Sequence, residues 1–115
     1  MDPNCIFCRI IAGESPSTIV YKDKQIVAFL DIHPAAPVHI LIVPRQHIPS
    51  INHLTGDHET LLGHLYTVTK QLASEYGVAE SGYRLIINSG PDARQAVLHL
   101  HLHLLGGREM RYPMG

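Results

Sequence analysis

The stretch Ala96-Val-Leu-His-Leu-His-Leu-His-Leu-Leu105 alternates histidine with leucine from His99 to Leu104. A period of two residues predicts a β-strand, because successive side chains of a strand point to opposite faces of a sheet. The leucines would then face a core, while the three histidines would share the other face, about 6–7 Å apart along the strand. Three imidazoles on one face suit metal or phosphate binding, or acid–base and nucleophilic chemistry near neutral pH. A strand face that met only solvent would more often carry Thr, Lys, Glu or Ser.

Hydrophobic patterning in the rest of the chain predicts four further strands and two helices. Apolar residues at helical spacing, from Leu61 to Leu72, indicate a long amphipathic helix over 56–76, and a short helix is expected at 5–12. The predicted strands are 18–21, 26–30, 38–43, 83–88 and 96–105. This order favours an α+β fold, with an antiparallel sheet of about five strands, one long helix and one short helix. The whole chain, 1–115, is expected to form a single domain.

Composition and charge disfavour several classes of protein. The 115 residues carry a net charge of −1 at pH 7 with histidines neutral, which argues against a general electrostatic grip on nucleic acid or on an anionic membrane. No run of about 18 apolar residues is present, so no membrane-spanning helix is expected. The N-terminal sequence lacks a basic start followed by a long apolar stretch, so no secretory signal is expected either. A cytoplasmic location is therefore predicted.

Several motifs accompany the histidines. The segment 37–48 reads PVHILIVPRQHI, Asn88-Ser89-Gly90 and Gln95 precede the histidines, and Gly106-Gly107-Arg108 follows them. With Ile6-Phe7-x-Arg9-Ile10-Ile11 near the N-terminus, these motifs extend over nearly the whole chain. The chain therefore resembles the histidine triad (HIT) superfamily, and within it the Hint branch of histidine triad nucleotide-binding proteins. The resemblance implies a HIT-like fold.

The same resemblance implies a hydrolase or nucleotidyl transferase that cleaves purine nucleoside phosphoramidates, such as AMP linked to an amine. The family's nucleophile is the middle histidine, here His101, which would attack the α-phosphate and form a covalent nucleotidyl-histidine that water hydrolyses. A backbone carbonyl would hold the proton of one ring nitrogen and leave the other nitrogen free to attack. His103 and loop amides would contact the phosphate oxygens. His39 matches the family's fourth histidine near the active site, or else it is a hydrogen-bonded core residue.

The resemblance also assigns the residues that bind substrate. Asp31 would accept hydrogen bonds from the ribose hydroxyls, because a carboxylate is a natural partner for a diol. Ile32 and neighbouring apolar residues would line the base pocket. Asn88 and Gln95 would orient the sugar and the phosphate, together with His101 and His103.

The sequence departs from the family pattern on both sides of Gln95. Arg94 stands where the family usually has glycine, and Ala96 stands where it often has Ser or Thr. That hydroxyl is thought to hold the phosphate or to protonate the leaving amine. Its absence therefore affects leaving-group assistance rather than the nucleophile. Arg94 would either supply a compensating positive charge or be solvated.

The two cysteines lie in one motif, Cys5-x-x-Cys8, a spacing that suggests metal or redox chemistry in a reducing compartment. Two thiolates need two more ligands to hold zinc in a tetrahedron. Relatives in the superfamily that carry this motif place zinc on the histidines that correspond to His47 and His99. The resemblance therefore implies a structural zinc ion and no organic cofactor. The alternative is a pair of reduced thiols on a short helix.

The resemblance implies a homodimer, with the helix 56–76 and the strand 83–88 as its interface. The expected partners are thus a purine nucleotide and a second copy of the chain, with no nucleic acid and no membrane. Three other functions stay open: a dinucleoside polyphosphate hydrolase of the Fhit type, a nucleotide-binding regulatory module with little catalysis, and a zinc-dependent metalloenzyme built on the triad. The tail Gly106-Gly107-Arg108-x-Met110 favours the Hint branch over the Fhit branch.

Overall fold

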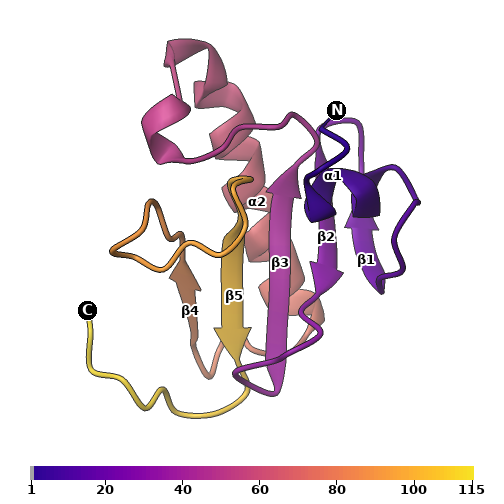
Figure 1. Ribbon diagram of the computed structural model, residues 1–115. Coiled ribbons are helices and arrows are strands. Elements are labelled where there is room, and N and C mark those ends of the chain that lie inside the picture. The colour runs from indigo at the N-terminus through magenta and orange to yellow at the C-terminus, as the bar shows by residue number, and fades with distance from the viewer. Residues whose placement is uncertain (1) are drawn as a thin grey trace.

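The computed structural model describes residues 2–115, and its strands form one five-stranded antiparallel sheet in the order β1-β2-β3-β5-β4 (Figure 1). The strands are β1 (Ile19–Lys22), β2 (Ile26–Leu30), β3 (Val38–Pro44), β4 (Tyr83–Ile86) and β5 (Leu102–Gly106). The central strand β3 is the longest and is rich in β-branched residues, which favour an extended backbone. The predicted α+β class, with an antiparallel sheet of five strands, is confirmed.

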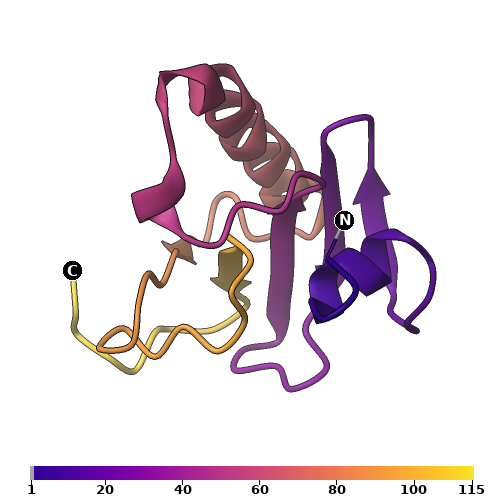
Figure 2. The same cartoon turned by 45° about the horizontal axis from the view of Figure 1, so that its top comes forward.

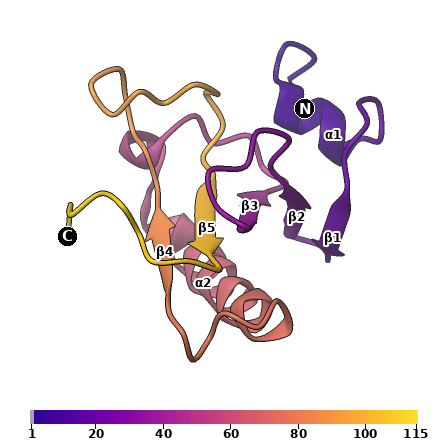
Figure 3. The same cartoon turned by 90° about the horizontal axis from the view of Figure 1, so that it is seen from below.

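Two α-helices lie on opposite faces of the sheet, and two 3-10 turns precede the longer helix (Figure 3). These elements are α1 (Ile6–Ile11), α2 (Glu59–Glu75) and the turns Ile51–His53 and Gly56–His58. The predicted helix 56–76 therefore begins as a 3-10 turn, in which Thr55 and His58 form a capping box. No helix within residues 2–115 is both long and apolar enough to cross a membrane.

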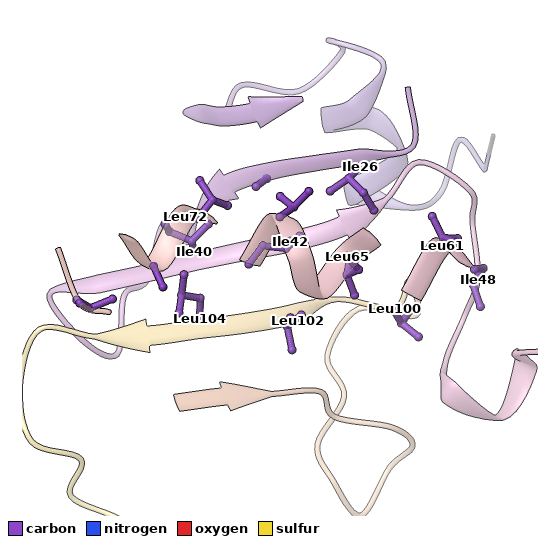
Figure 4. Close-up of a cluster of buried hydrophobic side chains, with 14 residues drawn as sticks. Ile26, Ile40, Ile42, Ile48, Leu61, Leu65, Leu72, Leu100, Leu102 and Leu104 are labelled. Carbon is purple, nitrogen blue, oxygen red and sulfur yellow. The ribbon is translucent and has the colours of Figure 1, made fainter. Parts of the chain in front are cut away.

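The side chains of β3 alternate between two buried clusters, one on each face of the sheet. Ile40 and Ile42 join the larger cluster, which contains Leu102 and Leu104 of β5 and residues of α2 such as Leu65 (Figure 4). Leu41 and Val43 join the smaller cluster, which contains both cysteines and the phenylalanine of α1. Because both faces of β3 are apolar, the sheet needs a cover on each side. The helices α1 and α2 supply these covers.

The predicted strand 96–105 is wrong in its first half, because β5 begins only at Leu102. Its ladder with β3 stops where β3 reaches Pro44, which has no N–H to donate. The Pro44 carbonyl is also occupied, since it accepts a hydrogen bond from the His99 ring at 2.8 Å. The predicted strand 83–88 is shortened for a related reason: β4 ends at Ile86, near the start of its partner.

The alternation of side chains nevertheless continues upstream of β5. Leu100, Leu102 and Leu104 all lie in the larger core cluster beside α2. The Leu100 N–H donates to the carbonyl of Ile48 at 2.6 Å, so the chain stays tied to the segment that follows β3. The face predicted for the leucines is therefore correct, although only one of the three histidines belongs to the strand itself. The other predicted elements agree with the observed ones within one residue at each end, apart from the end of the short strand β4 and the start of α2, which lies three residues after the predicted one.

The turn between β1 and β2 is held by one carboxylate. Asp23 Oδ1 accepts hydrogen bonds from the N–H groups of Gln25 and Ile26, at 2.7 and 2.8 Å. Asp23 Oδ2 accepts from the Tyr21 hydroxyl and from His64 Nε2 on α2, both at 2.6 Å. Burial raises the pKa of Asp23, but the hydrogen bonds from Tyr21, Gln25, His64 and Ile26 together lower that pKa well below its usual range. Asp23 thus joins the β1–β2 hairpin to α2 in its ionised form.

The Asp23→Asn variant should lose about 2 kcal/mol of unfolding free energy, because an amide replaces an anion that accepts four hydrogen bonds. The folded pKa is lower than the unfolded pKa, so the stabilisation is present above pH of about 4 and is lost as pH falls through the folded pKa. Urea unfolding at several pH values measures the difference. Asp92→Asn, in an exposed loop, is the control. A gap between wild type and Asp23→Asn that stays constant down to acid pH would contradict this account.

Candidate active site

Three histidines from two parts of the chain meet on the face of the sheet opposite α2. His39 lies on β3, His103 lies on β5, and His101 lies one residue before β5. The ring centroid of His103 is 5.2 Å from that of His39 and 5.0 Å from that of His101. The helix α1 and the loop between β4 and β5 lie on this same side of the sheet (Figure 2). The structure therefore brings together the three side chains that the sequence assigned to the chemistry.

His101 is buried, and a backbone carbonyl holds one of its ring nitrogens. Its Nδ1–H donates to the carbonyl of His99 at 2.6 Å. A ring nitrogen that donates carries the proton, so the neutral His101 ring has its lone pair on Nε2. The Phe7 ring packs edge-on against the imidazole, with the two centroids 5.0 Å apart. His101 thus offers a single nucleophilic nitrogen in a ring that is fixed from two sides.

Burial favours the neutral form of each of these histidines. Burial lowers the pKa of His101 below its usual range, although the His99 carbonyl and the Asp31 charge oppose the shift. Burial and the nearby rings of His101 and His39 lower the pKa of His103 to about 4. Burial also lowers the pKa of His39, against the charge of Asp31. Because a neutral imidazole keeps a lone pair, the cluster suits nucleophilic and hydrogen-bonding chemistry at neutral pH.

The loop between β2 and β3 places a carboxylate beside the histidines. Asp31 Oδ1 accepts a hydrogen bond from the His33 N–H at 2.8 Å, and Asp31 Oδ2 lies 3.4 Å from His39 Nε2. Ile32, the predicted base-pocket residue, is 79% exposed and is not enclosed by its own chain. Asn88 is half-buried in the loop after β4, and within residues 2–115 its side chain makes no hydrogen bond.

Gln95 shapes the loop that precedes the histidines. Its Oε1 accepts from the Gly90 N–H at 3.0 Å, and its Nε2 donates to the carbonyls of Pro49 and Val97 at 2.7 and 3.0 Å. Both amide N–H donors and one lone pair of the amide oxygen are thus used inside the protein. The preceding Arg94 has φ of 59°, a left-handed conformation that glycine adopts more easily than arginine. Arg94 and Ala96 are both exposed.

The Gln95→Glu variant should lose roughly 1–3 kcal/mol of unfolding free energy, because it replaces two N–H donors with a carboxylate oxygen that faces two carbonyls. Faster amide hydrogen exchange along residues 90–97 should accompany the loss. Gln46→Glu is the matched control, since Gln46 is exposed and a carboxylate can still pair with His58 there. Wild-type stability and exchange in Gln95→Glu would show that the side chain does not hold the loop.

The predicted metal ligands also come together, beneath α1. Cys5, Cys8, His47 and His99 each offer one ligand atom, and these four atoms lie within 4.8 Å of one another. The Sγ–Nδ1 distances are 3.4, 3.4 and 3.6 Å, and the two Nδ1 atoms are 3.2 Å apart. A zinc tetrahedron with bonds of about 2.3 Å to sulfur and about 2.0–2.1 Å to nitrogen requires separations of about 3.6 Å and about 3.3 Å. The donor set and its spacing therefore fit a zinc ion.

The surroundings of these ligands agree with a metal site. The His99 Nε2–H donates to the Pro44 carbonyl, which leaves the lone pair on Nδ1, facing the thiols. His47 Nε2 lies 3.8 Å from the Asp2 carboxylate, which favours the same arrangement of the proton in His47. Burial raises the pKa of the Cys5 thiol. A nearby dication would favour the thiolate instead.

Phe7 belongs to the site although its motif gave it no role. Its ring makes edge contacts with Phe29, His99 and His101, with centroids 5.3, 5.9 and 5.0 Å apart. Through these contacts, the position of α1 directly affects the position of the His101 ring. The signal in the sequence was the Ile6-Phe7 pair, but the contact with His101 depends on how α1 docks on the sheet.

Comparisons with known proteins agree on one family. The HIT domain model matches residues 12–110. The chain is 48% identical over 110 residues to the purine nucleoside phosphoramidase of Escherichia coli K12, which covers 96% of this chain and 92% of that protein. The crystal structure of a HIT family hydrolase from Legionella pneumophila Philadelphia 1 has 49% identity and a TM-score of 0.94, covering 97% of this chain and 100% of that one. A Zn-bound histidine triad family protein from Mycobacterium smegmatis has 30% identity and a TM-score of 0.78, with coverage of 91% and 76%.

Proposed function

Because the chain belongs to the HIT domain family, as its motifs predicted, we propose that it is a nucleotide-binding hydrolase that cleaves purine nucleoside phosphoramidates. The observation that carries the proposal is the buried His101, whose Nδ1–H is held by a carbonyl and whose Nε2 has the lone pair. The 48% identity to a purine nucleoside phosphoramidase over 96% of this chain supports the substrate class.

The proposed reaction has two displacement steps at phosphorus. First, Nε2 of His101 attacks the α-phosphorus, a bond from phosphorus to the ring forms, and the bond to the amine breaks. The leaving amine takes the electron pair and then a proton from solvent. Second, water attacks the same phosphorus and releases a proton to solvent, the bond to Nε2 breaks, and the nucleoside monophosphate leaves. The His99 carbonyl accepts from Nδ1–H throughout, so it stabilises the positive charge of the phosphorylated ring.

Four further residues are proposed to contact the nucleotide, and a fifth is proposed to position the loop beside it. Asp31 Oδ2 is available to the ribose hydroxyls, and Ile32 would contact the base from its exposed position. His103 would contact the phosphate oxygens beside His101. Asn88 would contact the sugar and phosphate, while Gln95 would act through the loop that it holds.

Ala96 gives a second candidate substrate class some support. Alanine has no hydroxyl, so this side chain cannot protonate a leaving amine. A leaving group that departs as a stable anion, such as a nucleoside polyphosphate, needs less help with its proton. Dinucleoside polyphosphates are therefore the second candidate, and the loop that carries Ala96 also carries the exposed, positively charged Arg94.

The His101→Ala variant should lose turnover of adenosine phosphoramidate by about a thousandfold or more, since it has no nucleophile, while AMP binding is largely kept. Steady-state kinetics with adenosine and guanosine phosphoramidates, and with diadenosine polyphosphates, measures both the loss and the substrate class. Mass spectrometry of the wild type should trap a nucleotidyl adduct on His101. The His53→Ala variant is the control, because His53 is exposed on the 3-10 turn Ile51–His53 and lies outside the histidine cluster. Wild-type turnover in His101→Ala would end the proposal.

A structural zinc ion held by the Cys5, Cys8, His47 and His99 cluster is part of the proposal. The fit of the ligand distances and the carbonyl that orients the His99 ring support it. The name of the relative from Mycobacterium smegmatis describes that protein as Zn-bound. Four protein ligands close the coordination shell, so the ion would add stability and leave no site for a reactive water.

Protein purified without chelator should therefore contain close to one equivalent of zinc per chain, measured by elemental analysis. The Cys5→Ser variant should lose zinc and melt at a lower temperature, because the free energy of metal binding is part of the free energy of folding. Removing zinc should clearly lower the melting temperature, whereas kcat of the protein that stays folded should change little. Less than about a tenth of an equivalent of zinc, with wild-type melting in Cys5→Ser, would leave two reduced thiols as the better description.

We also propose that two copies pair through α2 and β4, in the cytoplasm, with residues 1–115 acting as one domain. The strand β4 is one of the two edge strands of the sheet, so its outer hydrogen-bonding groups are open to a partner. Tyr66 on α2 and Tyr83 on β4 are 47% and 37% exposed in the single chain. Large aromatic side chains are enriched in protein interfaces, so their exposure supports pairing through these two elements. A twofold pairing would bury both elements against their own copies.

A further inference from the structure

The Gly106-Gly107-Arg108 motif touches the loop between β2 and β3, and the proposed chemistry gives the motif no role. The Arg108 guanidinium donates a hydrogen bond to the carbonyl of Ala35. Gly107 has φ of 94° and packs on Pro37, where an added Cβ would lie 2.9 Å from the Pro37 Cβ. The turn that follows β5 therefore contacts this loop at two points, through Arg108 and through Gly107.

The same loop donates a hydrogen bond into the histidine cluster. The Ala35 N–H donates to His39 Nδ1 at 3.0 Å. A ring nitrogen that accepts has no proton, so the neutral His39 ring carries its proton on Nε2. His39 Nε2 lies 2.9 Å from His103 Nδ1 and donates to it. His103 Nδ1 is then the acceptor, and the proton of the neutral His103 ring is on Nε2.

The burial that lowers the pKa values of His39 and His103 keeps both rings neutral, so each ring has one defined tautomer at neutral pH.

The possible ligand atoms of Asp31, His39 and His103 lie within 4.8 Å of one another, which raises the question of a second metal ion. A metal on His39 Nε2 would force the proton onto Nδ1, which already accepts from the Ala35 N–H. The backbone therefore assigns this cluster to hydrogen bonding rather than to metal binding.

We propose that Arg108 is a positioning residue: by holding the Ala35 carbonyl it keeps the Ala35 N–H on His39 Nδ1, and so fixes His103 with its proton on Nε2. Through that Nε2–H, His103 donates to a phosphate oxygen as charge develops there. Arg108 itself touches neither substrate nor His101. The inference rests on the proposed phosphoramidate hydrolysis, since the donor on His103 matters only where a phosphoryl group binds.

A long-range ¹H–¹⁵N spectrum of the wild-type protein at neutral pH tests the tautomers without any activity measurement. We expect His39 and His103 to carry their protons on Nε2, and His101 to carry its proton on Nδ1 as an internal reference of opposite type. Single substitutions of each histidine assign the signals. A proton on Nδ1 of His39 or of His103 would overturn the inference.

The Arg108→Met variant should lower kcat for adenosine phosphoramidate by roughly 10–100-fold, by analogy with the loss of an outer partner that orients a metal-bound histidine. Its His39 signals should shift toward a mixture of tautomers, while its melting temperature stays near that of wild type. Arg108→Lys keeps a cationic donor and should recover part of both losses, and it carries the test if the Met variant does not fold. Arg111→Met is the control, because Arg111 is exposed and its side chain makes no hydrogen bond within the described chain.

Two outcomes separate this inference from the proposed function. Wild-type kcat in Arg108→Met, or a lower kcat with an unchanged His39 tautomer, would reject Arg108 as a positioning residue while the hydrolase stands. A wild-type protein that hydrolyses no phosphoramidate would reject the function, and with it the role of the His103 donor. The spectra would still report whether Arg108 holds the His39 tautomer.

Discussion

The hydrogen bond from the His99 ring to the Pro44 carbonyl is the interaction on which the rest of the site depends. It occupies a carbonyl that the β3–β5 ladder would otherwise use, so the strand stops and the chain before it can turn. It also fixes the proton of His99 on Nε2, which directs Nδ1 toward the two cysteines. The carbonyl of the same residue accepts from His101 Nδ1. One side chain thus joins the end of the sheet, the metal-ligand cluster and the proposed nucleophile.

The alternation of leucine and histidine has a packing reason as well as a chemical one. Leu100, Leu102 and Leu104 are almost completely buried, and burial of each leucine side chain stabilises the fold by about 1.5–3 kcal/mol. A slip of one residue in the register would move three imidazoles into this core and three leucines into the active site. The leucines therefore hold the histidines in place, and the stability of the core and the geometry of the site cannot be separated along this segment.

The sequence predicted what depends on local periodicity and missed what depends on distant partners. The alternation indicated the two faces of β5, the β-branched run of residues 38–43 indicated the central strand, and the HIT-like fold predicted from the motifs is confirmed by close structural neighbours. The early end of the β5 ladder depends on Pro44, which lies 55 residues from its partner His99. The contact between Arg108 and Ala35 spans 73 residues. Such contacts produce no periodic pattern in the sequence, because each involves a single pair of residues that only the folded sheet brings together.

Four neighbouring imidazoles have different tasks available to them because backbone groups decide which nitrogen of each ring carries the proton. In His99 a carbonyl holds Nε2–H, so the lone pair of Nδ1 is available to a metal ion. In His101 a carbonyl holds Nδ1–H, so the lone pair of Nε2 is available to phosphorus. In His39 an amide donates to Nδ1, so Nε2–H points at His103 and makes that ring a donor in turn. The four side chains are chemically identical, so their different tasks come from their positions. A histidine placed elsewhere in the sheet would not reproduce the site. The information lies in the carbonyl and amide groups that the turns around β3 and β5 present to each ring.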